Sequence, residues 1–163
     1  MKKSWWSTWP SNIKFVASQP QNSLKVKFKK LYKDAVVPSY AKEGDAGLDL
    51  TATHMTLVRE FIEYGTGIAV EIPEGYVGLV FPRSSVSKKE NFYLKNSVGV
   101  IDSGYRGEIK LRFNNGSLGA NYYQPGEKIG QLIILPYPTI YLEQVDELSS
   151  TERGEGGFGS TGN

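Results

Sequence analysis

Apolar and polar residues alternate with a period of two along much of the chain, and this pattern predicts β-strands rather than helices. Residues 24–30, LKVKFKK, place apolar side chains against lysines, as in a half-buried strand. The same alternation occurs at 107–113, GEIKLRF, which ends at an Asn-Asn-Gly turn. Two more apolar segments, 129–138 and 140–148, predict further strands near the C-terminus.

A tight turn separates two other apolar segments. Residues 67–72, GIAVEI, pass through Pro-Glu-Gly at 73–75 into 76–81, YVGLVF. Because proline and glycine are typical of turns, we predict a β-hairpin here. No stretch keeps a period of 3.6 residues, and one short helix is predicted at 84–90, directly after Arg83.

Short strands separated by glycine, proline and asparagine turns predict an all-β fold, an antiparallel barrel or sandwich of jelly-roll type. A chain of 163 residues suits one domain with its own core. We expect three parts: an N-terminal extension at 1–23, a β-barrel body at 24–148 and a glycine-rich arm at 149–163. Without an apolar segment suited to export or membrane insertion, we expect a cytoplasmic protein and no membrane partner.

The composition excludes several kinds of site. The chain has no cysteine, which rules out disulfides, thiolate nucleophiles and thiolate metal sites. Its single histidine, His54, cannot form a multi-histidine metal site. Because His54 lies in the ordinary alternating stretch TATHMT, we predict a structural or surface role for it.

Charge is distributed unevenly along the chain. Residues 1–33 hold eight lysines and no acidic residue, so the remainder has a net charge of −6 within a total of +2. Trp5, Trp6 and Trp9 also lie in this basic segment. It could bind nucleic acid, an acidic partner or a neighbouring subunit. The alternative, which we favour, is a solvated tail whose tryptophans pack on the domain surface.

Four segments of the body interrupt the strand pattern with polar groups. Each has a structural explanation of its own, as a turn cap, an ion pair or a partner for the backbone. Together with the C-terminal arm they supply arginines, hydroxyls, carboxylates and aromatic rings, which suits an anionic substrate with a flat ring. The residues are Asp49 in DAGLDL, Arg83 in PRSS, Asp102 and Tyr105 in NSVGVIDSGYRGE, and Gln131 in PGEKIGQLI.

A triphosphate carries about four negative charges, more than Arg83 and Arg153 can offset, so a divalent cation is expected. Mg²⁺ binds mainly through substrate phosphates and water, with one or two carboxylates assisting. Without cysteine or a catalytic histidine, the simplest hydrolytic chemistry is attack by water activated by a carboxylate.

Residues 24–162 resemble the homotrimeric dUTP pyrophosphatases, or dUTPases. Five sequence motifs occur in that family's order, and the third and fifth are highly specific. The motifs are AGLDL at 46–50, PRSS at 82–85, NSVGVIDSGYRGE at 96–108, GEKIGQLI at 126–133 and RGEGGFGSTG at 153–162. The resemblance implies a distorted jelly-roll barrel with a flexible C-terminal arm. It also implies hydrolysis of dUTP to dUMP and pyrophosphate, which keeps uracil out of DNA and supplies dUMP for thymidylate synthesis.

The third motif is similar to the family's base and nucleoside site. The resemblance implies that Asp102 is the general base that activates water to attack the α-phosphorus. It implies that Tyr105 lies beneath the deoxyribose, where a ribose 2′-hydroxyl would clash. It also implies that Asn96, with the backbone around Gly99 and Val100, reads uracil.

The first, second and fourth motifs resemble the family's phosphate and metal site. By this resemblance Arg83, Ser84 and Ser85 bind phosphate, and Gln131 contacts the α-phosphate. Asp49 matches the acid that holds water ligands of Mg²⁺.

The fifth motif resembles the mobile arm of the family. Arg153, Ser160 and Thr161 match contacts to the γ-phosphate, and Phe158 matches the ring that stacks over uracil. The resemblance implies that this arm closes over a neighbouring subunit's site, so that a homotrimer has three shared sites. Residues 1–23 have no counterpart in the family's common core.

Two other functions remain open at this point. The dCTP deaminases share the implied fold and part of the second motif, and ammonia release from dCTP would identify one. A nucleotide-responsive regulatory protein is the second alternative, which the basic, tryptophan-rich segment would support.

Overall fold

The computed structural model describes residues 23–88, 92–114 and 122–157. Its elements are β-strands and one short 3-10 helix, η2, which occupies Ser84–Lys88. The all-β fold class is therefore confirmed. The strands are β1 (Lys27–Lys30), β2 (Leu48–Thr51), β3 (His54–Val58), β4 (Phe61–Gly65), β5 (Ile68–Glu71), β6 (Tyr76–Pro82), β7 (Gly99–Ile101), β8 (Lys110–Asn114) and β9 (Lys128–Pro136).

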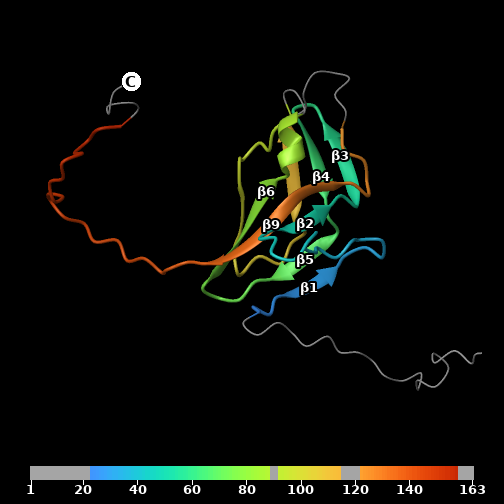
Figure 1. Cartoon of the computed structure of the whole chain (residues 1–163), viewed down its shortest axis with the longest axis horizontal. Coiled ribbons are helices and arrows are strands. Elements are labelled where there is room, and N and C mark those ends of the chain that lie inside the picture. The colour runs from blue at the N-terminus through green and yellow to red at the C-terminus, as the bar shows by residue number, and fades with distance from the viewer. Residues whose placement is uncertain (1–22, 89–91, 115–121, 158–163) are drawn as a thin grey trace, which may run out of the picture.

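The strands form three antiparallel sheets that enclose one core (Figure 1). The largest sheet has the strand order β2-β9-β6-β7. The second has the order β3-β4-β8, and the third consists of β1 and β5. Since β6 and β9 occupy the middle of the largest sheet, the functional residues at its edges are held at fixed distances by strand register.

Alternation in β8 places its apolar residues in the core, as the sequence predicts. Leu111 and Phe113 are buried, whereas Lys110 and Arg112 point to solvent. The ring of Phe113 stacks on Phe92 with centroids 4.6 Å apart. This aromatic contact joins β8 to the segment that leads into β7, next to the candidate site.

The predicted hairpin at 67–81 is wrong, although both of its strands exist. The turn is present, because the Tyr76 amide donates to the Pro73 carbonyl and Gly75 has a φ of 81°. However, β5 pairs with β1, and β6 pairs with β7 and β9. The turn is thus a corner between two sheets. Alternation within each strand predicts a strand but does not specify its partner.

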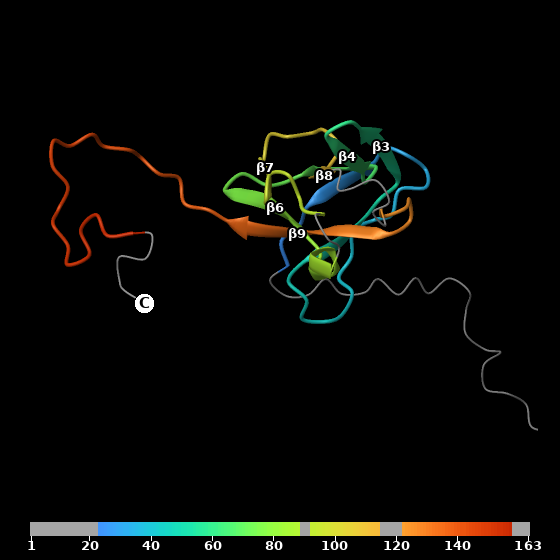
Figure 2. The ribbon, with the colours of Figure 1, turned by 90° about the horizontal axis from the view of Figure 1, so that it is seen from above.

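The strand predicted at 24–30 is confirmed only over Lys27–Lys30, and the half-burial predicted for it is wrong, since Phe28 remains 52% exposed. The strand predicted at 140–148 is wrong: this segment has no strand pairing in the described chain. After β9 the chain leaves the barrel and runs away from it (Figures 1 and 2). A strand needs a pairing edge, and this arm meets none among the residues that the structure describes.

Within the described residues, no helix has both the length and the apolar character needed to cross a membrane. Residues 1–22, which hold three of the eight lysines of the basic segment and all three tryptophans, lie outside the described residues, whereas the other five lysines lie in or beside β1. The expectations for a nucleic-acid or acidic partner at that end therefore remain predictions.

Candidate functional site

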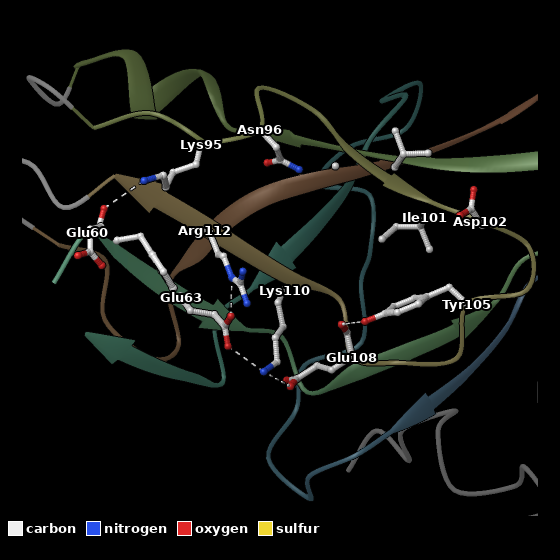
Figure 3. A pocket seen from close by; sticks show the side chains of 13 residues that line it. Glu60, Glu63, Lys95, Asn96, Ile101, Asp102, Tyr105, Glu108, Lys110 and Arg112 are labelled. Carbon is white, nitrogen blue, oxygen red and sulfur yellow. Dashed lines mark hydrogen bonds and ion pairs between the residues drawn. The ribbon is translucent and has the colours of Figure 1, made fainter. Parts of the chain in front are cut away.

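A hollow of about 710 Å³ lies between the segment that carries the third motif and the outer face of β4 and β8 (Figure 3). One wall comes from Asn96 and the stretch from Gly99 to Tyr105. The opposite wall is charged, with Glu63, Lys110 and Arg112 on adjacent strands. The predicted base, sugar and uracil residues thus share one cavity.

Asp102 follows directly after β7, at the point where that strand leaves the sheet. Its carbonyl accepts a hydrogen bond from the Tyr105 amide at 3.0 Å, which closes a tight turn. The Asp102 side chain is exposed, and it has no ion pair with any of the residues that the structure describes. A carboxylate with no internal partner is available to accept a proton from water.

The Tyr105 ring is held against the turn that carries it. Its hydroxyl donates to the Glu108 carbonyl at 2.9 Å. The ring also requires glycine at position 107, because a Cβ there would lie 2.3 Å from the Tyr105 hydroxyl oxygen. Tyr105 remains 43% exposed and lines the hollow.

The uracil-reading residues predicted from sequence lie on an edge strand. β7 is the last strand of its sheet, so its backbone groups on the outer side have no strand partner. Gly99 packs against Val80 of β6, with 3.1 Å from its would-be Cβ to the Val80 Cβ. Ser97 turns the chain with a φ of 59°, a conformation that is uncommon for a non-glycine residue. This turn places Asn96 beside the edge.

A second polar cluster lies where β2 and β9 pair. Asp49 is only 5% exposed, and both of its oxygens face cations. Lys128 Nζ lies 2.7 Å from Asp49 Oδ2, and Arg83 Nε lies 3.5 Å from Oδ1. Gln131 is the register partner of Asp49 on β9. Because a buried carboxylate requires partners, these two cations compensate for the burial of Asp49.

Lys128 was missed by the sequence analysis. The signal was weak: an exposed lysine at the start of an alternating strand, one residue before buried Ile129, reads as ordinary strand polarity. Only the pairing of β9 with β2 brings its ammonium to Asp49.

The helix after Arg83 is confirmed as the 3-10 helix η2. Its two predicted phosphate ligands face different ways. Ser84 is exposed, whereas the Ser85 hydroxyl lies 3.1 Å from the Tyr123 hydroxyl and faces the barrel.

Strand register keeps the two clusters apart in one chain. Ile101 pairs with Gly78 of β6, and Gln131 pairs with Phe81, so Asp102 lies four residues along β6 from the level of Gln131. Four residues span about 13 Å, and the two intervening strand spacings add about 10 Å across the sheet. Asp102 and Gln131 are therefore separated by roughly 16 Å.

Arg153, the one predicted arm residue within the described part of the chain, reaches neither cluster. Arg153 is exposed on the extended C-terminal segment, where its side chain donates to the Gly156 carbonyl. Phe158, Ser160 and Thr161 lie outside the described residues.

The charged wall of the hollow is a compact ion-pair network. Lys110 Nζ lies 2.8 Å from Glu63 Oε1, and Arg112 Nε lies 2.7 Å from Oε2 (Figure 3). The hydrogen bond from Lys110 lowers the pKa of Glu63 below its ordinary value, and Glu63 raises the pKa of Lys110. Both cations are thus engaged by protein carboxylates.

Among the described residues, no group of three or more acids and histidines could hold a metal ion. A divalent cation near Asp49 or Asp102 would therefore depend on oxygen ligands from substrate and water.

Comparison with known proteins identifies the family. The dUTPase family model matches residues 33–162. A deoxyuridine 5′-triphosphate nucleotidohydrolase from Clostridium kluyveri is 43% identical over 136 residues, covering 82% of this chain and 95% of that protein. The corresponding protein from a Hydrogenobaculum species is 42% identical, and the match covers 85% of this chain and 99% of that protein.

Solved structures agree with these matches. The dUTPase of Staphylococcus bacteriophage 80alpha with dUpNHpp has a TM-score of 0.74 and 32% identity, covering 86% of this chain and all of that one. A mutant dUTPase from phage phi11 of S. aureus, in which a structural Mg(II) ion is coordinated, has a TM-score of 0.66 and 29% identity. It covers 76% of this chain and 98% of that one.

Proposed function

Because the chain belongs to the dUTPase family and is a dUTP diphosphatase, we propose that Asp102 is the general base of its reaction. Asp102 removes a proton from water, the oxygen of which attacks the α-phosphorus of dUTP. The bond from that phosphorus to the bridging oxygen breaks, and pyrophosphate leaves. The observation that supports this assignment is the exposed Asp102 carboxylate on the edge of the hollow, with no ion pair among the described residues.

The nucleoside occupies the hollow beside β7. Uracil lies against Asn96 and the outer backbone edge at Gly99 and Val100, since an edge strand offers donors and acceptors in a fixed order. Backbone groups arranged for uracil mismatch the amino group of cytosine. The deoxyribose lies on the exposed Tyr105 ring.

The phosphates bind at the cluster around Arg83, Ser84, Ser85 and Gln131, and that cluster comes from a second subunit. In one chain Asp102 and Gln131 are roughly 16 Å apart, too far to meet on one α-phosphate. A second copy of the chain can supply the phosphate cluster if its paired strands β2 and β9 lie against the hollow of the first copy. The same geometry repeated by a closed symmetry gives a homotrimer with three shared sites.

The exposed C-terminal arm also requires a neighbour. Ile140, Tyr141 and Leu142 are 73%, 90% and 85% exposed, which is a large apolar surface for an isolated chain. An apolar hollow of about 560 Å³ beside β1 offers a matching surface on another copy. The arm would then carry Arg153, Phe158, Ser160 and Thr161 to a site that it shares.

Mg²⁺ fits this site as an ion carried by the substrate. Asp49 and Asp102 lie far apart, and the described residues contain no cluster of acids that could hold a metal ion. Phosphate oxygens and water would therefore be the main ligands of the ion. Asp49 would hold its water ligands, and Lys128 and Arg83 form ion pairs with that carboxylate. When bound, the ion would neutralise charge on the triphosphate.

Pyrophosphate release from dUTP, dCTP, dTTP and UTP tests the proposal, with wild type compared with Asp102→Asn. Wild type should hydrolyse dUTP alone, and the variant should lose about 10²- to 10⁴-fold. A loss of only a few-fold would reject Asp102 as the base. Ammonia release from dCTP would instead identify a deaminase, and chelation by EDTA should abolish dUTP turnover.

A further inference from the structure

We infer that Glu108 is a positioning residue that fixes the Tyr105 ring and thereby sets the discrimination between deoxyribose and ribose. This inference rests on the proposed place of the sugar over Tyr105. Glu108 acts through two of its groups. Its backbone carbonyl accepts the Tyr105 hydroxyl at 2.9 Å, and its carboxylate is anchored elsewhere in the barrel (Figure 3).

The Glu108 carboxylate is anchored where β4 passes into β5. Its Oε1 accepts the Gly67 amide at 2.7 Å. Its Oε2 lies 3.7 Å from His54 Nε2 and 3.9 Å from Lys110 Nζ. The side chain is only 9% exposed, so these contacts replace water.

The corner that receives this carboxylate leaves no room for side chains at its two glycines. A Cβ at Gly65 would lie 2.6 Å from Glu108 Oε1 and 2.2 Å from the His54 ring. Gly67 has a φ of 67°, and a Cβ there would lie 2.7 Å from the Ala35 Cβ. Gly65 therefore allows the close approach of Glu108 to the corner, and Gly67 allows the close approach of Ala35.

The corner itself is rigid. Thr66 is 1% exposed, and its hydroxyl donates to the Ile109 carbonyl at 2.8 Å. The Ile109 amide donates to the Ile68 carbonyl at 2.9 Å. A carboxylate tied to this corner holds the residue 108 carbonyl at a fixed place relative to the core. The Tyr105 hydroxyl donates a hydrogen bond to that carbonyl, so the position of the ring is fixed relative to the core as well.

Position matters here because the sugar is distinguished by one hydroxyl. If the Tyr105 ring is held firmly beneath the deoxyribose, it excludes the 2′-hydroxyl of ribose by steric contact. If the ring can shift, a ribose can be accommodated. Loss of the anchor would also leave the buried Gly67 amide without its acceptor. We therefore expect UTP to be rejected less well when the carboxylate no longer reaches Gly67.

Two substitutions at position 108 distinguish the effect of side-chain length from the effect of side-chain charge. Glu108→Asp keeps the charge but is one methylene shorter, so it no longer reaches the Gly67 amide. Glu108→Gln loses the charge but keeps an oxygen at the right distance. Steady-state kcat/KM for dUTP and UTP, with thermal unfolding of each variant, gives the readout. Glu127→Ala is the control, because the Glu127 carboxylate also accepts a backbone amide, that of Gln124, away from the hollow.

Glu108→Asp should raise the ratio of kcat/KM for UTP to that for dUTP by about tenfold, whereas Glu108→Gln and Glu127→Ala should change it less than about threefold. Tyr105→Phe should raise the ratio too, and combining it with Glu108→Asp should add little, since both break one linkage. An unchanged ratio in a folded Glu108→Asp variant would overturn the inference. Equal changes of the ratio in Glu108→Asp and Glu108→Gln would also overturn it, as would additive effects of Glu108→Asp and Tyr105→Phe in the double variant.

Failure of the proposed function would look different. Wild type inert towards dUTP, or Tyr105→Ala with an unchanged ratio, would reject the site assignment itself. If Tyr105→Ala changes the ratio and neither Glu108→Asp nor Tyr105→Phe does, only the role of Glu108 is rejected.

Discussion

Lys128 Nζ lies 2.7 Å from Asp49 Oδ2, so a half-exposed ammonium on β9 neutralises a buried carboxylate on β2. The pair joins two strands of the largest sheet at the cluster that we assign to phosphate. Removing one partner of such a pair leaves a charge buried without adequate compensation, because Arg83 alone lies farther away, at 3.5 Å.

Lys128→Met should therefore destabilise the protein by about 2 kcal/mol, less than for a fully buried pair because Lys128 is partly solvated. Urea unfolding measures this free energy. Lys27→Met is the matched control, since Lys27 forms an equally short but exposed pair with Glu71. Its effect should be clearly smaller than that of Lys128→Met, because solvent screens an exposed pair. Equal losses in the two variants would contradict the structural importance of burial at Asp49.

Mixing two inactive variants tests whether sites are shared. Asp102→Asn and Arg83→Ala should each be nearly inactive alone. If Asp102 and Arg83 of one site come from different subunits, unfolding and refolding the two variants together at equal amounts restores native sites. Random assembly would make roughly a quarter of the sites native. Pyrophosphate release from the mixture measures the recovery. No recovery, in particles shown to contain both variants, would place each site within one chain.

Two glycines in the Tyr105 turn form a matched pair. Gly107→Ala should displace the Tyr105 ring, because its Cβ would lie 2.3 Å from the hydroxyl oxygen. We expect kcat/KM for dUTP to fall by about tenfold or more, since small misplacements of positioning groups are costly. Gly104→Ala is the control, as a Cβ there meets nothing within 4 Å. Steady-state kinetics with circular dichroism would show the contrast, and comparable losses in both would contradict it.

Glu63 should stabilise the folded protein near neutral pH and lose this contribution as the pH falls. Its hydrogen bond from Lys110 holds its folded-state pKa below the ordinary 4.5. A lowered folded-state pKa means that the stabilisation is present above the unfolded pKa and is lost as pH falls through the folded one. Glu63→Gln should thus lose stability near neutral pH and show a shallower decline below about pH 4.5. Urea unfolding between pH 3 and 7 checks this, with exposed Glu74→Gln expected to leave the wild-type profile unchanged.

Local patterns in the sequence identified β1, β5, β6, β8 and β9, but they did not identify β2, β3, β4 or β7, and the strand predicted at 140–148 was wrong. Alternation identified β8, because burial of every second side chain is a property of a single strand, and a continuous apolar segment identified β9. The motifs identified Asp102, Tyr105 and Gln131 as candidates, since five motifs occur in the dUTPase order, although each residue taken alone has an ordinary structural explanation.

Only the tertiary structure decided which groups meet. Alternation does not name a strand's partner, so the assignment of β5 and β6 to different sheets, and the contact of Lys128 with Asp49, depended on pairing between distant segments. The anchoring of Glu108 on Gly67 likewise joins residues 41 positions apart. Register alone set the distance between Asp102 and Gln131. Strand pairing depends on contacts between distant segments across the whole core, so a short sequence motif does not determine it.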